Sequence, residues 1–214
     1  MSAKATESNL VSLEAASTSE SLILPNPCSP SSIISMILKK SKAQNLLDEN
    51  KLHSPLQNYK TMIDGILRTI YIEAEVHFSS LDKGCDPNEH GIADAKTYGE
   101  PGGIPTQFIS KKLGGDGNIR NIYPANPNAD FGTSEIHQNL VYDHVKKGGD
   151  RFAKLFFGVI YEEGGEEAIE DEDYDENHGI NYFRPKEIVY KFELYENDKT
   201  VGETLEGKII NILP

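Results

Sequence analysis

The chain has 214 residues, of which 37% are hydrophobic and 26% are charged. This composition is ordinary for a globular protein, and the length is enough to bury a substantial core. No apolar run approaches the roughly 20 residues that a membrane-spanning helix requires, so we expect no membrane-embedded segment. The formal net charge of −13 disfavours nucleic acid as a tightly held partner, because proteins that grip phosphates usually carry a basic surface.

The N-terminal segment, residues 1–30, is rich in Ser, Ala, Glu and Pro, and we expect a disordered or extended leader. It lacks the basic and apolar regions of a secretory signal peptide, and its acidic residues are atypical of a transit peptide. The two cysteines, Cys28 and Cys85, are far apart and belong to no Cys-x-x-Cys pair, so we interpret them as free thiols in a reducing compartment. The sequence therefore predicts a cytoplasmic protein, or one exported without a classical signal peptide.

Residues 31–54 form the next segment, for which the pattern predicts an amphipathic helix followed by a linker. Ser31 or Ser32 can cap this helix, and its apolar residues recur at helical spacing. These residues are Ile33, Ile34, Ile37, Leu38, Leu46 and Leu47. Two interpretations stay open: the helix packs on its own domain, or residues 31–52 dock into a groove of a protein partner.

The main domain is expected at residues 55–214, and its first half is typical of β-structure. Asp64 and Gly65 indicate a hairpin turn between two apolar runs. Beyond the turn, apolar and polar residues alternate over residues 70–78, which predicts a strand with one buried face. Residues 79–106 contain many turn-forming residues, and we expect a long loop there.

The second half of the domain is expected to contain one helix and several strands. Residues 134–147 have an apolar face at helical spacing, with Thr133 or Ser134 as the cap and Gly148 as the stop. The predicted strands are residues 152–161, 188–195 and 201–213.

An acidic segment, residues 162–176, lies between two of these predicted strands. It contains ten acidic residues and no basic ones, so it carries most of the net charge of the chain. We expect a solvated insertion. The alternatives are a cation-binding patch, or a mimic of phosphate charge that occupies a basic protein partner.

The most informative motifs lie between residues 107 and 130. They are Gln107, Gly114-Gly115-x-Gly117, Asn121-Ile122-x-Pro124 and Asp130. In this order and spacing they resemble the active-site segment of the DNA/RNA non-specific endonucleases, the ββα-metal or His-Me finger family. The similar variant is the one found in type VII secretion and polymorphic toxins. The resemblance extends over roughly residues 58–195.

The resemblance implies an α+β fold, with an antiparallel sheet, a ββα-metal-like finger and one main helix crossing the sheet; the predicted N-terminal helix is an extension. In the family a strand His takes a proton from water, and one Mg²⁺ held by an Asn stabilises the phosphate charge. Gln107 stands at the position of that His, and a carboxamide does not accept a proton near neutral pH. His137, on the helix that follows, is the candidate for a relocated base.

The resemblance places Asp130 where the family has its metal-binding Asn, and a carboxylate suits Mg²⁺. Asn126 and Asn128 are either alternative ligands or turn residues. Three basic residues are candidates for phosphate binding, with solvated side chains as the alternative: Lys111, Lys112 and Arg120.

Two functions follow from these residues. The favoured one is an endonuclease-like protein that is degenerate in its catalytic site and acts as a binding or structural module. The alternative is an active Mg²⁺-dependent phosphodiester hydrolase, such as a nuclease toxin, with an altered site. A third interpretation, an unrelated α+β protein with a fortuitous motif match, predicts no helix crossing a hairpin near Asp130.

Overall fold

The computed structural model describes residues 29–40, 46–48, 54–99, 102–162 and 183–211. Within these ranges the larger sheet has seven antiparallel strands, in the order β1-β2-β3-β6-β7-β8, with β9 also paired to β7. The strands are β1 (Leu46–Asp48), β2 (Gln57–Ile63), β3 (Thr69–His77), β6 (Arg151–Ile160), β7 (Glu187–Glu196), β8 (Lys199–Thr200) and β9 (Leu205–Ile210). The predicted strands at 70–78, 152–161 and 188–195 are confirmed, and β9 lies within the predicted segment 201–213.

Alternation of side chains explains why the central strand β3 presents a continuous apolar face to the main core. Ile72, Ala74 and Val76 point into the main core, whereas Glu73 and Glu75 lie on the other face and are only half-buried. Successive side chains of a strand point to opposite faces, so a period of two creates one apolar surface. That surface belongs to the main core, to which helix α3 (Gly132–Lys146) contributes the fully buried Val141 and Val145.

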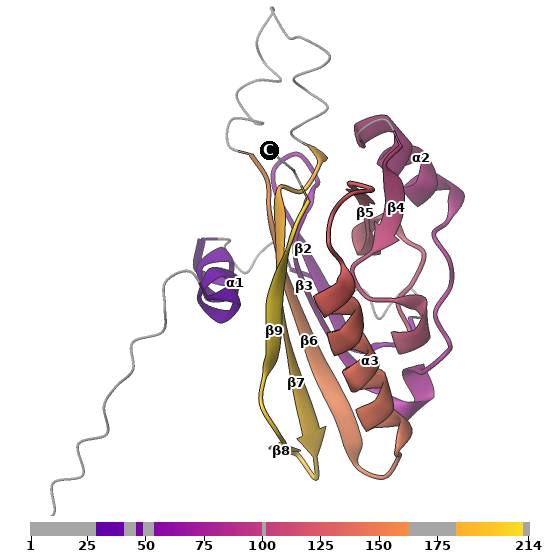
Figure 1. The fold of residues 1–214 in the computed structure, drawn as a ribbon, viewed down its shortest axis with the longest axis vertical. Coiled ribbons are helices and arrows are strands. Elements are labelled where there is room, and N and C mark those ends of the chain that lie inside the picture. Colours follow the sequence, from indigo (N-terminus) through magenta and orange to yellow (C-terminus); the bar gives the residue numbers. More distant parts are fainter. Residues whose placement is uncertain (1–28, 41–45, 49–53, 100–101, 163–182, 212–214) are drawn as a thin grey trace, which may run out of the picture.

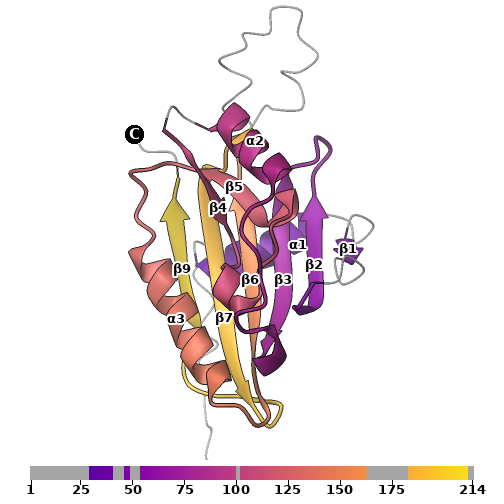
Figure 2. The same cartoon turned by 90° about the vertical axis from the view of Figure 1, so that its right-hand side faces the viewer.

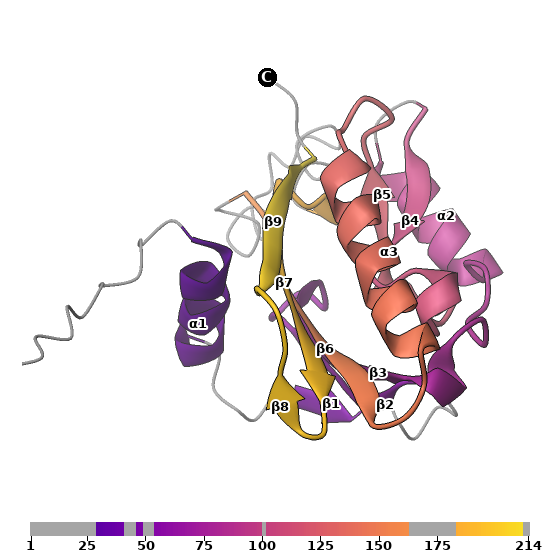
Figure 3. The same cartoon turned by 60° about the horizontal axis from the view of Figure 1, so that its bottom comes forward.

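A two-stranded hairpin, β4 (Ile104–Gln107) and β5 (Ile122–Ala125), precedes α3 along the chain. The hairpin, the chain between its two strands and α3 are called the finger below. Helix α3 then crosses the inner face of the larger sheet and contacts β6, β7 and β9 (Figures 1 and 3). The mixed α+β class, the mainly antiparallel sheet and the crossing helix agree with the expectation. A helix follows a hairpin near Asp130, which the third interpretation did not predict.

The segment 79–106 is not the long loop that we expected. It contains α2 (Glu89–Tyr98), which begins where the Asn88 side chain accepts a hydrogen bond from the backbone N–H of Gly91. Its buried residues are only Gly91 and Ala95, so its sequence carries almost no apolar stripe. Short 3₁₀ turns complete the connections: η3 (Phe78–Ser80), η4 (Lys111–Leu113) and η5 (Ile119–Asn121).

Helix α1 (Pro30–Lys40) lies on the outer face of the sheet, opposite α3 (Figure 3). Its Ile34 is buried against Met62, Tyr71 and Val189. Gly158 in β6 permits this close approach, because a Cβ there would lie 2.8 Å from the Cδ1 of Ile37. The helix therefore packs on its own domain, as one of the two open interpretations stated.

The predicted helical stripe is too long at its C-terminal end. Leu46 and Leu47 belong to β1, which pairs with β2, and the helix ends at Lys40. The apolar residues of such a short segment fit either a helix or a strand. Leu46 and Leu47 form a strand because this segment pairs with β2. Residues 1–28 of the predicted leader and most of the acidic segment lie outside the described residues. No helix in the described ranges is long and apolar enough to span a membrane.

Replacing Ile34 by Ala tests the docking of α1. The change should lower the free energy of unfolding by about 2 kcal/mol or more, because it removes a buried side chain and leaves a cavity. Met36→Ala on the same helix is the matched control, since Met36 is 51% exposed. Urea unfolding of both variants measures the difference, and equal effects would contradict the packing of α1 on the sheet.

Candidate functional site

Gln107 is the last residue of β4 and pairs with Ile122 of β5. Its side-chain Nε2 donates two hydrogen bonds, to the carbonyl of Cys85 at 2.9 Å and to that of Asp116 at 2.7 Å. Both amide hydrogens are therefore used on backbone acceptors from two different loops. At the position where the sequence resemblance placed a proton acceptor, the Gln107 side chain connects two loops.

Asn121 holds the same region from inside. It is fully buried, and its Nδ2 donates to the carbonyls of Ile109 and Asp116 at 3.0 and 2.9 Å. Its Oδ1 accepts from the Ile109 N–H at 2.9 Å. Gly115 must be a glycine, because a Cβ there would lie 1.8 Å from the Ile109 carbonyl oxygen. The Gly-Gly-x-Gly and Asn motifs thus serve backbone geometry in this chain.

Gln138 ties α3 to the chain that follows β4. Its Oε1 accepts from the Ser110 N–H at 3.0 Å, and its Nε2 donates to the Phe108 carbonyl at 3.2 Å. Sequence reasoning missed this residue. The available signal was a glutamine on the buried side of a predicted amphipathic helix, next to Val141.

A cavity of about 270 Å³ lies between β4, α3 and the inner face of the sheet. Its apolar lining includes Phe108, Phe131 and Phe157, and its polar lining includes Gln107 and Glu135. Glu135 is in the first turn of α3, where the helix dipole favours a negative charge. Glu135 is exposed, and it is the one carboxylate among the described residues that line the cavity. Sequence reasoning did not select it as a site residue.

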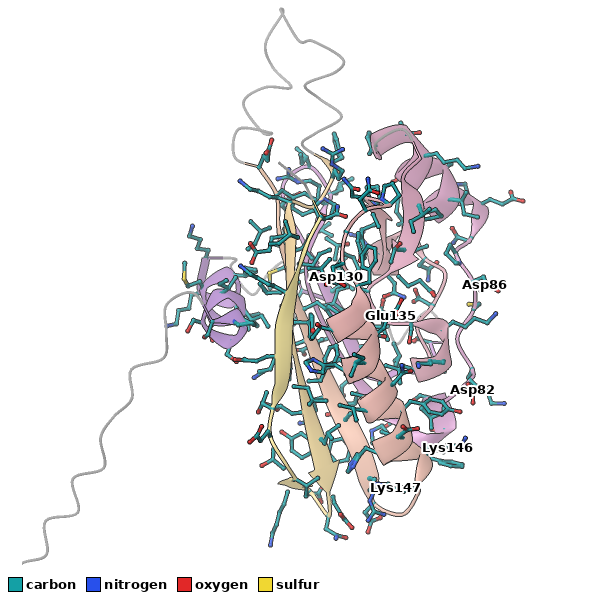
Figure 4. All side chains as sticks on the ribbon, in the orientation of Figure 1. Asp82, Asp86, Asp130, Glu135, Lys146 and Lys147 are labelled. Atoms are coloured by element: carbon teal, nitrogen blue, oxygen red, sulfur yellow. The ribbon has the colours of Figure 1, made fainter. Side chains whose placement is uncertain are left out.

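The candidate metal ligands hold the turn that leads into α3. Asp130 is exposed, and its Oδ1 accepts from the Gly132 N–H at 2.9 Å. The Oδ1 of buried Asn126 accepts from the Asn128 N–H at 2.8 Å. Figure 4 shows Asp130 at the start of α3 and Glu135 farther along the helix. Among the residues that the structure describes, no group of three His, Cys, Asp or Glu side chains could hold a metal ion.

This donor set does not fit a preformed Mg²⁺ site. One oxygen of Asp130 and the amide oxygen of Asn126 are engaged in turn hydrogen bonds, whereas Mg²⁺ requires near-octahedral oxygen coordination.

The three candidate phosphate-binding residues do not converge on the cavity. The Nζ of Lys111 lies 2.7 Å from the Oδ2 of Asp86, and the Nζ of Lys112 lies 5.7 Å from the centre of the Tyr142 ring. Arg120 lines a separate cavity beside α2. These three basic side chains therefore form no common cluster of positive charge that could bind a phosphate.

His137 is not among the described residues that line the cavity. It packs against Tyr190 of β7. Its Nδ1 is 3.2 Å from the Tyr190 hydroxyl, and the two rings meet edge to face. Burial lowers the pKa of His137 below its ordinary value. His144 is buried and its Nε2 lies 2.9 Å from the Tyr195 carbonyl.

Comparison with known proteins finds two similar solved structures. One is described as an extracellular endonuclease, with a TM-score of 0.48 and 12% identity, over 81% of this chain and 93% of the other. The second is described as an extracellular nuclease, with a TM-score of 0.44 and 10% identity, over 73% of this chain and 86% of the other. No known protein family and no curated protein sequence matches the chain. The likeness concerns the course of the chain and does not reach the residues of a site.

Gln107→Leu tests the cross-link between the two loops. We expect a loss of roughly 1–3 kcal/mol in the free energy of unfolding, because two backbone carbonyls lose their donor. Thr106→Val is the matched control, since the Thr106 hydroxyl makes only a 3.4 Å contact with the Ile104 carbonyl within its own strand. Chemical denaturation compares the two, and an unchanged Gln107→Leu variant would exclude a structural role for this amide.

The lowered pKa of His137 predicts a dependence of stability on pH. Below the ordinary His pKa of about 6.5, the unfolded chain gains a proton that the folded chain resists, so stability falls as the pH falls. His137→Gln should therefore lose less stability than the wild type between pH 7 and pH 5. His90→Gln, at an exposed position, is the control. Urea titrations at both pH values give the comparison, and identical pH dependence in wild type and His137→Gln would contradict it.

Proposed function

We propose that this protein is an endonuclease-like binding or structural module, in which the ββα finger is a scaffold and does not hydrolyse phosphodiesters. The observation that carries the proposal is the Gln107 amide, which spends both of its hydrogens on the Cys85 and Asp116 carbonyls. Hydrolysis by the family's route needs a group that takes a proton from water, and a carboxamide is not such a group.

The other polar side chains around the finger support the same proposal. Asn121 and Gln138 bond to backbone groups, as Gln107 does. Loss of general-base catalysis alone costs about 10²–10⁴ in rate. A finger in which the amides of Gln107, Asn121 and Gln138 bond to backbone groups has the properties of a support rather than of a reaction centre.

The charge distribution supports a binding role that does not depend on phosphate. The net charge is −13, and Lys111 is already paired with Asp86. Helix α1 buries Ile34 but exposes Met36 and Leu38, at 51% and 40%. We place a protein-partner surface on that exposed side of α1, with the acidic segment 162–176 as the second candidate surface.

The alternative function is an active Mg²⁺-dependent phosphodiester hydrolase with an altered site. One observation favours it: exposed Glu135 lines the cavity beside Gln107, and exposed Asp130 lies just before the same helix. A carboxylate can accept a proton, so Glu135 is a better candidate for a replacement base than His137, which is held against Tyr190.

A nuclease assay separates the two functions. Plasmid DNA and RNA are incubated with the purified chain and millimolar Mg²⁺ or Mn²⁺, beside an active nuclease as the positive control. We expect no cleavage above background from the wild type. Gln107→His restores the family's base, and cleavage by this variant alone would strengthen the account of a lost base.

The controls identify the source of any cleavage. Metal-dependent cleavage by the wild type that disappears in Asp130→Ala or Glu135→Gln would contradict the proposal and establish the alternative. Cleavage that survives both changes and His137→Gln and still co-purifies with the chain would also contradict the proposal, whereas cleavage that separates from the chain on further purification comes from a contaminant.

A further inference from the structure

A second cavity, of about 320 Å³, lies beside α2, and Glu135 is not among the described residues that line it. It is enclosed by the β2–β3 turn, by α2, by η5 with β5, and by the chain on either side of residues 163–182. Figure 2 shows α2 and the finger strands beside the β2–β3 hairpin, on the face turned toward the viewer. This volume is within the range of small-molecule sites.

Two ring contacts line this cavity. The Arg68 guanidinium lies 4.3 Å above the centre of the Tyr161 ring, and Tyr98 stacks on Phe183 with ring centres 4.4 Å apart. The Tyr161 hydroxyl donates to the Thr69 carbonyl at 3.0 Å, which fixes the ring. Aromatic rings and a stacked guanidinium are surfaces that bind flat π-systems.

The β2–β3 turn at the rim is rigid. One oxygen of Asp64 accepts from the N–H groups of Ile66 and Arg68, and the other accepts from the Arg68 Nε at 2.6 Å. Leu67 is held at a φ of 70° with 71% of its surface exposed. A leucine in the left-handed region is strained, and such strain concentrates where a ligand is clamped.

Asp94 supplies a polar group without a partner inside the cavity. It is half-buried, and within the described part of the chain it makes no hydrogen bond or ion pair; His90 on the same helix is its electrostatic neighbour. Burial raises the pKa of this carboxyl. Arg120 lines the same cavity, so a positively charged side chain and the Asp94 carboxyl belong to one site.

We propose that this cavity binds a guanine base, with the ring against the aromatic groups and its edge against the Asp94 carboxylate. An ionised carboxylate only accepts hydrogen bonds and offers two oxygens. Guanine alone among the four bases presents two adjacent donors on one edge, N1–H and the N2 amino group. Adenine and cytosine place an acceptor beside their amino group, and uracil flanks its single N–H with two carbonyls. Arg120 is suited to the phosphate of the nucleotide.

This cavity contains neither Gln107 nor Glu135 in its lining, although Tyr123 borders both cavities. The inference therefore goes beyond the proposed function and does not depend on the absence of catalysis. The base can come from a free nucleotide or from an unpaired guanosine in a strand. Both sources share the same ring and edge, and the experiment distinguishes them.

Calorimetry measures binding of the 5′-monophosphates of guanosine, adenosine, cytidine and uridine to the full chain, with ribose 5-phosphate as the ligand that lacks a ring. We expect the guanosine form to bind about tenfold or more tightly than the others, the discrimination typical of one two-point base contact. Short single-stranded oligonucleotides with one or no guanosine form the second arm. Tighter binding of the guanosine strand than of the monophosphate assigns the strand as the source, and the reverse assigns the free nucleotide.

Two variants of one residue make the test specific. Asp94→Ala should weaken guanosine monophosphate binding about tenfold or more, whereas Glu89→Ala, an exposed carboxylate on the same helix, should leave it unchanged. Asp94→Asn should shift the preference from guanosine to adenosine, because a carboxamide pairs its donor and acceptor with adenine.

A merely structural role for Asp94 gives a different result. It predicts a lower melting temperature for Asp94→Ala, whereas a half-buried carboxyl without a partner predicts an unchanged or higher one. Three outcomes would overturn the proposal: no binding of any monophosphate at millimolar concentration, equal binding of ribose 5-phosphate, or wild-type affinity in Asp94→Ala.

Discussion

The hydrogen bonds from side-chain amides to backbone carbonyls are the constraint on which this finger depends. Gln107, Asn121 and Gln138 together connect the chain at Cys85, the turn at Asp116, the strand end at Phe108–Ser110 and helix α3. A buried backbone group without a partner is costly, and this irregular region has too little regular pairing to satisfy its own carbonyls. The side-chain amides therefore supply hydrogen bonds that strand pairing supplies in a regular sheet.

The same constraint accounts for the Gly and Asn motifs of the finger by backbone geometry alone. The glycines near residue 115 exist because backbone passes within contact distance of backbone there. An asparagine at 121 exists because one side chain must both donate and accept in a dry interior. Neither requirement refers to a substrate, so both persist when position 107 carries an amide that holds loops together.

Much of the architecture follows from patterns in the sequence. The alternation from Ile70 onward predicts β3, and the apolar stripe predicts α3, because burial of one face is a local property of the chain. The expected caps Thr133 and Ser134 were wrong: the helix begins at Gly132, and its N-cap Phe131 makes no side-chain capping hydrogen bond. Helix α2 was missed because it is stabilised by an Asn88 cap and by two small buried residues. The two hydrogen bonds of Gln107 join residues that are 22 and 9 positions apart in the chain. Asp94 and Arg120 line one cavity because the fold brings α2 beside η5. Such distant pairings leave no periodic signal.

The most direct measurement of the central claim is hydrogen exchange of the glutamine side-chain amides by NMR. If the Gln107 amide bridges two carbonyls, both of its protons exchange slowly and give fixed, separate signals. The amide of Gln57, which is exposed, supplies the fast reference in the same spectrum. Exchange of the Gln107 protons at the Gln57 rate would contradict the account, because that amide would then be free for another role.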